Sequence, residues 1–543
     1  MTLRESNIAR LENEDFDALI IGSGINGAVS AAALAARGIR VALIDAADFA
    51  GFTSQQSSNL VWGGIKYMEG YEFGLVAGLC KSRNELLDSF PSTVKEIRFL
   101  MTVNKQFRFH PWVILASTWL YWILGRGKTR TPRLVSSRQI KQTEPLINTF
   151  TSTGGIEYSD AFLHDNDARF VFNFVRSAMD KGCIAANYVK SKGATRDADG
   201  NWTTQVEDQL SGKQFSIRSR ILINAAGAFV DKHNELTGIE TEYHHLLSKG
   251  IHLIVPQISD SHRVLAFFAD DERLFFAIPM ANRTCIGTTD TRVVDPVTAV
   301  TDEDRDFVLS NINARLDLPV PLTRDDVIAE RCGVRPLATR QNHDQSVDVQ
   351  QLSRKHVIEV TPGQNHISIF GGKLTDCLNV GNEICDCVAK LGLQPEKVGK
   401  WYGEPDRKAR EAYFRRARKL GIDEIFASDT SEPLSERLWR RYAEHAQGML
   451  DAIEQDPGLS KPLVENAGIR RCEIEYLAAN EMIVKLEDYL RRRSKIELLM
   501  SHDELRQSAG LFEACEKLFG DDAKKRFDEY FKQTSHIANT RVN

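Results

Sequence analysis

Residues 15–46 read DFDALIIGSGINGAVSAAALAARGIRVALIDA and predict a β-strand, a helix and a second β-strand in succession. Between the first strand and the alanine-rich helix, Gly22, Gly24 and Gly27 form the pattern G-x-G-x-x-G. The first glycine permits a tight turn, the second lets backbone approach a pyrophosphate, and the third allows close packing of helix on strand. The pyrophosphate then meets backbone N–H groups at the positive end of the helix. The stretch therefore predicts the start of a dinucleotide-binding α/β domain.

The second predicted strand ends at an acidic residue, Asp45, which lies 21 positions after Gly24. A carboxylate at this position can accept hydrogen bonds from the ribose of an adenosine, and it disfavours a 2′-phosphate. We therefore do not expect NADP. A glycine pattern alone says little, but here the strand, the glycines, the helix and the acid all stand at the required distances.

The composition is that of an ordinary globular protein of 543 residues, with 42% apolar and 26% charged residues. This length predicts about three domains. The net charge of -5 provides no basic field, so nucleic acid is not an expected partner. The nine cysteines form no C-x-x-C pair, which predicts reduced thiols and no metal site. Because the first residues contain no apolar signal segment, we expect a cytoplasmic chain or one on an inner membrane face.

One segment departs from this pattern: residues 111–124, PWVILASTWLYWIL, are apolar and rich in aromatic residues, with basic residues on both sides. The segment is too short to span a bilayer, which needs about 20 residues. A helix lying in the lipid headgroup layer fits its composition, and so does a buried core helix. The first alternative predicts peripheral membrane contact, and the sequence leaves both open.

Two later segments, residues 219–229 and 366–376, predict strands that end in small-residue turns, the second leading into a helix near Leu374. Residues 246–292 contain short alternating segments typical of an antiparallel sheet. From about residue 403 the chain is charged and helix-periodic. The sequence therefore predicts an α/β fold: a discontinuous Rossmann-like domain with an inserted antiparallel-sheet substrate domain and an α-helical C-terminal domain.

Seven segments carry further motifs, in this order: TSQQSSNLVWGGIKYMEGYEF (53–73), GIEYSDAFLHDNDAR (155–169), SKGIHLIVP (248–256), IGTTDT (286–291), CGVRPL (332–337), FGGKLT (370–375) and LEDYLRRRSK (486–495). Together they resemble the FAD-dependent glycerol-3-phosphate dehydrogenases, members of the D-amino-acid-oxidase-like flavoproteins. The resemblance covers nearly the whole chain and implies three domains. These are an FAD-binding domain (1–95, 165–245 and 350–402), a substrate or cap domain (96–164 and 246–349) and a helical C-terminal domain (403–543).

The resemblance implies FAD as the cofactor, with its adenosine end on Gly22, Gly24, Gly27 and Asp45. It also implies contacts along the rest of the cofactor. The residues concerned are Thr53, Ser54, Ser57 and Ser58 beside the pyrophosphate and ribityl chain, Gly63 and Gly64 against the flavin ring, Ala226 and Gly227 near the adenine, and Gly372, Lys373 and Thr375 near the pyrimidine edge of the flavin.

The reaction that the resemblance implies is oxidation of the secondary alcohol of glycerol 3-phosphate to dihydroxyacetone phosphate, with electrons passed to a quinone. His252 matches the family's active-site histidine, and an imidazole suits a proton acceptor because its pKa lies near working pH. Lys373 would stabilise negative charge on the reduced flavin or the substrate oxygen. Arg335 and Arg354 match arginines that bind the phosphate, which guanidinium groups contact at two points.

The chain departs from the family at several positions beside the flavin. Where the family has K-L-I-H-G-G-L-R-Y, residues 59–67 read NLVWGGIKY, so that Trp62 replaces a histidine and Lys66 replaces an arginine. Lys66 keeps a charge for the active site but loses the planar fork of a guanidinium. After FGGKLT, Asp376 begins a run that replaces the family's threonine, tyrosine and arginine, adding an anion and removing a cation.

These departures leave three readings open. The first is a glycerol-3-phosphate dehydrogenase that passes electrons to a membrane quinone. The second is a paralogous dehydrogenase or oxidase that acts on another small hydroxy or amino acid, with Arg335 binding its carboxylate. The third is a flavin-binding protein without turnover. The electron acceptor and the oligomeric state, including a homodimer, also stay open.

Overall fold

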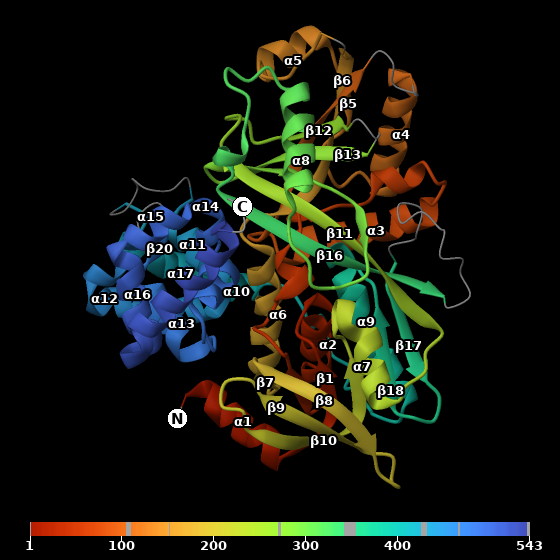
Figure 1. Ribbon diagram of the computed structural model, residues 1–543, viewed down its shortest axis with the longest axis vertical. Coiled ribbons are helices and arrows are strands. Elements are labelled where there is room, and N and C mark those ends of the chain that lie inside the picture. Colours follow the sequence, from red (N-terminus) through yellow and green to blue (C-terminus); the bar gives the residue numbers. More distant parts are fainter. Residues whose placement is uncertain are drawn as a thin grey trace. The chain divides into compact units, whose positions relative to one another are not determined.

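The computed structural model describes residues 2–104, 110–150, 152–269, 273–340, 355–424, 432–464 and 467–539 (Figure 1). The chain forms two compact units, each built from separate stretches of sequence. Unit 1 comprises Met1–Gly51, Ala168–Ile223 and Cys387–Asn543, and unit 2 comprises Phe52–Asp167 and Asn224–Asp386. The three domain boundaries expected from the sequence stay a prediction.

The first part of unit 1 is the predicted strand–helix–strand element. β1 (Asp15–Ile21), α2 (Ile25–Ala35) and β2 (Val41–Ile44) follow one another, and β1 and β2 pair in parallel with Ala18 opposite Val41. Nearly every residue of α2 is buried, as expected for a helix that is apolar all round. This parallel core confirms the Rossmann-like fold.

Further elements of unit 1 surround this core. β7 (Ile184–Ala186) pairs in parallel with β2, and an antiparallel meander joins β8, β9 and β10. The remaining elements of this part are α1 (Leu3–Asn13), α6 (Asp167–Met179), β8 (Val189–Arg196), β9 (Trp202–Asp208) and β10 (Gln214–Asn224).

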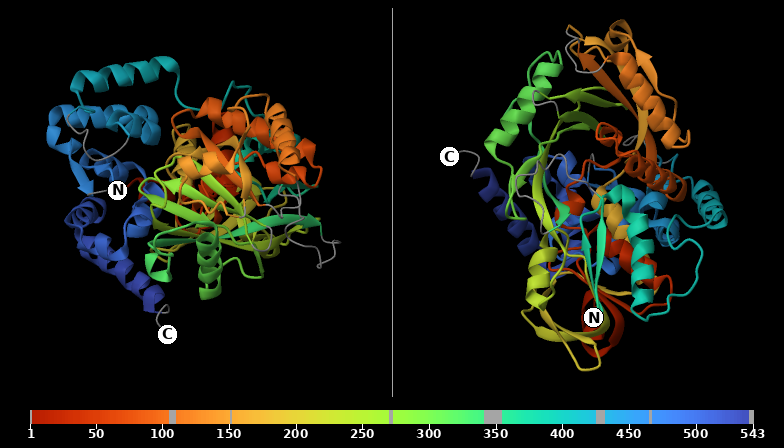
Figure 2. Two further views of the ribbon diagram at one scale, coloured as in Figure 1. Left: turned by 90° about the horizontal axis from the view of Figure 1, so that it is seen from above. Right: turned by 90° about the vertical axis from the view of Figure 1, so that its right-hand side faces the viewer.

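The C-terminal part of unit 1 is helical, as predicted, and Figure 2 shows its helices gathered in one group. Buried side chains such as Trp439, Tyr442 and Leu490 form its core. Its elements are α10 (Arg407–Leu420), α11 (Leu434–Tyr442), α12 (Ala446–Gln455), β19 (Pro462–Val464), β20 (Ile469–Arg470), α13 (Arg471–Asn480), α14 (Ile496–Leu499), α15 (His502–Gln507), α16 (Ala509–Phe519) and α17 (Ala523–Asn539).

The helix-periodic part of the chain is interrupted after α13. α13 ends at Asn480, and the next residue, Glu481, is a fully buried carboxylate that accepts hydrogen bonds from Arg169 at 2.5 and 2.9 Å. Met482 then has a φ of 49°, which no α-helix contains. Apolar periodicity cannot register a buried ion pair, so the sequence did not reveal this break.

A second buried ion cluster joins the first part of unit 1 to its helical part. The π-helical segment η9 (Asp488–Arg493) carries two arginines that contact Asp48, which is almost fully buried. Arg493 donates to the two Asp48 oxygens at 2.8 and 2.9 Å, and Arg492 Nε donates at 2.7 Å. Burial alone would raise the pKa of Asp48, but the charges of Arg493 and Arg492 outweigh it and hold that pKa below its ordinary value.

Unit 2 is built on a large, mostly antiparallel sheet, as expected for the inserted domain. Its strand order is β15-β11-β14-β13-β12-β4-β6-β3, with β16 also paired to β11 and β5 to β6. The strands are β3 (Leu60–Val61), β4 (Val94–Asn104), β5 (Arg133–Val135), β6 (Ser152–Leu163), β11 (Tyr243–Pro256), β12 (Val264–Phe268), β13 (Leu274–Met280), β14 (Arg283–Gly287), β15 (Thr291–Val293) and β16 (Ala329–Arg340).

Helices and one hairpin complete unit 2. Residues such as Ile251, Phe267 and Ile312 form an apolar core between the sheet and its helices. The elements are α3 (Phe73–Ser89), α4 (Pro111–Leu124), α5 (Ser137–Thr143), α7 (Val230–Thr237), α8 (Asp302–Arg315), the hairpin strands β17 (Val357–Thr361) and β18 (His366–Phe370), and the start of α9 (Cys377–Lys390).

The aromatic segment forms α4, with the bounds that the sequence suggested. Tyr121 and Thr118 face the interior of unit 2, whereas Trp112 is 64% exposed and Ile123 is 60% exposed. A helix buried in the core would not expose such side chains, so the structure disagrees with that alternative. None of the helices in the described ranges has both the length and the apolar character needed to cross a bilayer.

Candidate functional site

A pocket of about 280 Å³ in unit 2 is lined by residues from β11, β16 and several loops. Of the described residues that line it, three are lysine or arginine, one is histidine and none is acidic. The pocket therefore offers positive charge to a ligand. The lining residues are Thr53, Gln56, Ser57, Ser58, Leu60, Trp62, Tyr67, Gly250, His252, Phe276, Gly333, Arg335, Pro336, Leu337, Ala338, Lys355, Gly371, Gly372, Lys373, Leu374 and Thr375.

The pairing of β11 with β16 brings two predicted residues, His252 and Arg335, to one face. The strands run side by side (Figure 1), with Gly250 opposite Gly333 and His252 opposite Arg331. Because side chains alternate between the faces of a strand, positions two apart share a face. A Cβ atom on Gly250 would lie 2.0 Å from Nη2 of Arg335. Only glycine leaves room there for the guanidinium group.

His252 is a buried imidazole with an unpaired nitrogen. Only 3% of the residue is exposed, and its Nδ1 has no hydrogen-bond partner among the described atoms. Burial, and then the charges of Arg331 and Arg335, lower the pKa of His252 to about 3. The imidazole is therefore neutral at working pH, with a pKa well below the ordinary value on which its expected role as a proton acceptor was based.

Arg335 is oriented by the segment that contains the IGTTDT motif. Its Nη2 donates to Thr288 Oγ1 at 3.0 Å, and its Nη1 donates to the Thr289 carbonyl at 3.3 Å. Asp290 lies 3.4 Å from Nη1 and also accepts a hydrogen bond from Ser248 Oγ. A quarter of the Arg335 side chain is exposed, so the fixed guanidinium group can still be reached by a ligand.

Lys373 lies beside an aromatic group of side chains. Its Nζ donates to the Tyr67 hydroxyl at 2.6 Å and lies 4.1 Å from the centroid of the Tyr67 ring. The ring of Trp62 packs edge-on to Phe276 at a centroid distance of 6.3 Å. Trp62, which stands where the family has a histidine, therefore makes this side of the pocket aromatic. Tyr67, Phe276 and Lys355 were not singled out from the sequence, because nothing in their local pattern marks them.

The predicted site residues of unit 2 divide into two groups. Those that line the pocket are Thr53, Ser57, Ser58, His252, Arg335, Gly372, Lys373 and Thr375. Those absent from the described lining are Ser54, Gly63, Gly64, Lys66, Ala226 and Gly227. Arg354 lies outside the described residues. The roles assigned to all of these residues stay predictions.

The added anion Asp376 is not among the described lining residues. Its Oδ2 lies 2.9 Å from Nδ1 of His356, and its Oδ1 accepts hydrogen bonds from Ser82 at 2.9 Å and Asn379 at 2.6 Å. The departure from the family at this position therefore comes with a local partner, His356, which the sequence pattern did not reveal.

In unit 1 the glycine turn has the geometry that its pattern predicts. Gly22 has a φ of 95°, and its N–H donates to the Ile44 carbonyl at 2.8 Å. Gly24 is the N-cap of α2, where the structure shows no capping side chain. Asp45 accepts hydrogen bonds from Ser23 N and Oγ, both at 2.7 Å, and from Ala47 N at 2.9 Å. The acid is therefore fixed beside the turn.

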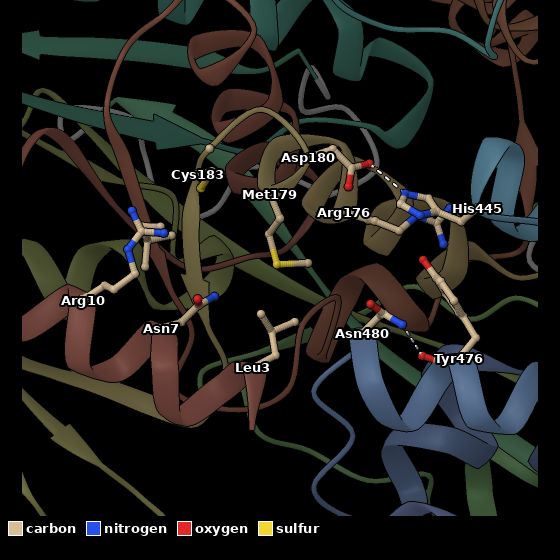
Figure 3. Close-up of a pocket in the computed structure, with 12 residues that line it drawn as sticks. Leu3, Asn7, Arg10, Arg176, Met179, Asp180, Cys183, His445, Tyr476 and Asn480 are labelled. Carbon is tan, nitrogen blue, oxygen red and sulfur yellow. Dashed lines mark hydrogen bonds and ion pairs between the residues drawn. The ribbon is translucent and has the colours of Figure 1, made fainter. Parts of the chain in front are cut away.

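Unit 1 also contains a smaller cavity of about 270 Å³, lined from α1, α6 and α13 (Figure 3). His445 and Asp180 point toward one another across it, with Nε2 and Oδ2 3.1 Å apart. Arg176 donates to Glu481 at 3.3 Å and to the Arg441 carbonyl at 2.8 Å. The opposite charges at this cavity are thus paired with one another, and we assign no reaction to it.

Neither unit contains, in its described residues, a group of three or more His, Cys, Asp and Glu side chains that could hold a metal ion. None of the nine cysteines, all of which the structure describes, forms a disulfide, and most of them are buried.

Comparison with known proteins gives consistent results. Residues 17–368 match the family described as FAD dependent oxidoreductase, and residues 405–526 match the C-terminal domain of alpha-glycerophosphate oxidase. A glycerol-3-phosphate dehydrogenase of Pseudomonas tolaasii is 32% identical over 509 residues, covering 90% of this chain and 94% of that protein. An aerobic glycerol-3-phosphate dehydrogenase of Staphylococcus haemolyticus is 30% identical, covering 90% of this chain and 88% of that protein.

The fold has a close counterpart among solved structures. The glycerol-3-phosphate dehydrogenase from Bacillus halodurans, complexed with FAD, aligns with a TM-score of 0.73 at 23% identity, covering 97% of both chains. The predicted fold class and the resemblance drawn from the seven motifs are therefore confirmed. The chain belongs to the FAD-dependent oxidoreductase family.

Proposed function

We propose that this protein oxidises glycerol 3-phosphate to dihydroxyacetone phosphate, with FAD accepting the hydride and a quinone receiving the electrons. The observation that carries the proposal is the pocket of unit 2, where a neutral buried imidazole, His252, and a fixed guanidinium group, Arg335, share one face, and where the described lining includes no acidic residue. Relatives that cover most of this chain are named glycerol-3-phosphate dehydrogenases.

The residues present fit FAD. In unit 1, the left-handed Gly22 and the helix end at Gly24 suit a pyrophosphate, which binds to backbone N–H groups at a helix N-terminus. In unit 2, Gly372, Lys373 and Thr375 offer backbone, a cation and a hydroxyl to the flavin ring. When bound, FAD supplies the acceptor for the hydride that leaves the alcohol carbon.

Side chains of the protein bind the phosphate, accept the proton of the alcohol and stabilise the negative charge that develops on the substrate oxygen. Arg335 binds the phosphate dianion through charge-assisted hydrogen bonds. His252 takes the proton of the alcohol as the carbonyl group forms, a transfer that contributes about 100- to 10,000-fold in rate. Lys373 stabilises negative charge that develops on the substrate oxygen.

A second candidate is oxidation of another small hydroxy or amino acid. The aromatic side made by Trp62, Tyr67 and Phe276 favours it, because the family's histidine is replaced there by a bulky apolar group. In that case Arg335 would bind a carboxylate in place of a phosphate.

Anaerobic mixing of the purified FAD-loaded protein with single substrates separates these functions, with flavin absorbance as the signal. Bleaching by glycerol 3-phosphate is the expected result. Bleaching only by other hydroxy or amino acids would establish the second candidate. If no member of either class bleached the flavin, both proposals would fail and a flavin-binding protein without turnover would remain.

The quinone acceptor and peripheral membrane contact rest on α4. Its exposed aromatic and aliphatic side chains, with the basic residues Arg126, Lys128 and Arg130 after its C-terminal end, suit the headgroup layer of a membrane, where quinones are accessible. We therefore propose that the protein works from the cytoplasm, bound at the inner face of the cytoplasmic membrane through residues 111–124.

A further inference from the structure

The buried side chains of Asp160, Arg83 and Tyr121 form a hydrogen-bonded network beside the peptide bond that joins Trp62 to Gly63. The N–H of this peptide belongs to Gly63 and donates to Asp160 Oδ1 at 3.1 Å. Its carbonyl belongs to Trp62 and accepts a hydrogen bond from Thr375 Oγ1 at 3.4 Å. Both polar groups of one peptide are thus held by side chains, and Trp62 and Thr375 themselves line the pocket.

Asp160 is fully buried, and its carboxylate is saturated with donors. Besides Gly63, it accepts from Tyr121 Oη at 2.5 Å, from Arg83 Nη1 at 3.2 Å and from the Ala161 N–H at 3.2 Å. Arg83 is also almost fully buried, with 1% of its side chain exposed. A buried charge pair of this kind costs desolvation energy and is weak evidence for stability alone, but its geometry is strictly defined.

The network also fixes Gly63 by shape. A Cβ atom at this position would lie 2.2 Å from the Tyr121 hydroxyl oxygen and 2.8 Å from Cys80 Sγ. The Tyr121 hydroxyl therefore rests against the glycine backbone while it donates to Asp160. Tyr121 lies on the inner side of α4, so this surface helix contacts the Trp62–Gly63 peptide, whose Trp62 side lines the pocket.

We infer that Asp160 is a positioning residue for the oxidation, and that Arg83 and Tyr121 act through it. The three side chains set the plane of the Trp62–Gly63 peptide, and with it the position of the Trp62 ring and the Thr375 hydroxyl at the pocket wall. This inference rests on the proposed function, in which that wall adjoins the flavin ring. Displacements of about 1 Å at a reacting centre can cost about 100-fold in rate.

Tyr121→Phe is the main test, because it removes one donor to Asp160 and keeps the ring that packs in α4. Tyr530→Phe is the matched control: Tyr530 is also buried, and its hydroxyl donates to a carboxylate, Glu497, at 2.9 Å, but it lies in α17 of unit 1. The readouts on FAD-loaded protein are the melting temperature, the flavin absorbance spectrum, its midpoint potential, and the rate of flavin reduction over a range of substrate concentrations.

We expect Tyr121→Phe to shift the flavin spectrum and potential and to lower the limiting rate of flavin reduction about tenfold, with less than a twofold change in substrate affinity. Tyr530→Phe should alter only the melting temperature. The inference is overturned if Tyr121→Phe matches Tyr530→Phe in every flavin property, because the network would then be merely structural.

Asp160→Asn removes the charge and should give a larger effect of the same kind. If this variant fails to fold, Tyr121→Phe still decides the question. The flavin spectrum and potential need no substrate, so they test the positioning role even if glycerol 3-phosphate leaves the wild-type flavin oxidised, a result that would refute the proposed function alone.

Discussion

His356 Nδ1 lies 2.9 Å from Asp376 Oδ2, and Nε2 of the same ring lies 3.1 Å from Glu383 Oε2. Burial by itself would lower the pKa of His356, but the hydrogen bond and charge of Asp376, together with Glu383, outweigh it and raise that pKa. For Asp376, burial would raise the pKa, and the hydrogen bond and charge of His356 lower it. Each of the two residues therefore stabilises the charged form of the other.

This pair of residues predicts a pH-dependent contribution to stability. Because the pKa of folded His356 is raised, its contribution is complete below its ordinary value of 6.5 and is lost as pH rises through the folded pKa. Because the pKa of folded Asp376 is lowered, its contribution is complete above 3.8 and is lost as pH falls through the folded pKa. The melting temperatures of wild type and His356→Gln should therefore differ more at pH 6 than at pH 9. An equal difference at both values would contradict the pair.

Removal of the guanidinium group from the pocket should weaken binding of a phosphorylated substrate. Hydrogen bonds to charged groups contribute about 1.5–3 kcal/mol, so Arg335→Ala should raise the dissociation constant of glycerol 3-phosphate about 10- to 150-fold. Arg335→Lys should recover part of the loss. Arg340→Ala, at the exposed end of the same strand, is the control. Unchanged affinity in Arg335→Ala would refute the phosphate-binding role.

From the low pKa of His252 we predict how the rate of flavin reduction depends on pH. Since burial and two arginines lower the pKa to about 3, the neutral imidazole is present throughout the pH range 5–9. The rate of flavin reduction at low substrate concentration should then show no loss near pH 6.5 that traces to His252. His252→Gln should lower that rate about 100-fold or more at every pH in the range. A variant with the wild-type rate would remove His252 as the proton acceptor.

The sequence identified His252 and Arg335 through the segments SKGIHLIVP and CGVRPL, which resemble those of the family. The pairing of β11 with β16 then brings the two residues to one face, with Gly250 and Gly333 between them. Lys355 reaches the pocket, and Asp160 reaches Gly63, only through tertiary contacts, which no local sequence pattern reveals. Similarly, the first strand–helix–strand element follows from local spacing, whereas the end of α13 depends on Arg169, about 300 residues earlier in the chain.

Exposed apolar side chains on α4 should mediate attachment to vesicles. Trp112→Asp together with Ile123→Asp should reduce cosedimentation with vesicles of mixed neutral and anionic phospholipid at least tenfold, because charged side chains are costly in the membrane interior. Val320→Asp, at a valine that is 75% exposed elsewhere in unit 2, should leave cosedimentation unchanged. If the double variant still sediments like wild type, the helix does not carry membrane contact.

Disruption of the Asp48 cluster should destabilise unit 1. Arg493→Met leaves a buried carboxylate with less compensation, and loss of one partner from a buried ion pair typically costs about 3–5 kcal/mol. Urea unfolding followed by circular dichroism should show this decrease in the free energy of unfolding. Arg506→Met, at an exposed position, should change the free energy of unfolding little. A decrease below about 1 kcal/mol would mean that Arg492 alone compensates Asp48.

The Asp48 cluster also constrains the order in which the parts of unit 1 can fold during synthesis. The glycine turn at residues 22–27 emerges from the ribosome long before the helical part of unit 1, and regions made earlier generally fold as they emerge. Here, however, Asp48 obtains its cationic partners only when residues 492 and 493 have been made, more than 400 residues later. The segment after β2 therefore lacks these partners until residues 492 and 493 have been translated. A ribosome-bound fragment that stops before residue 492 should not retain FAD.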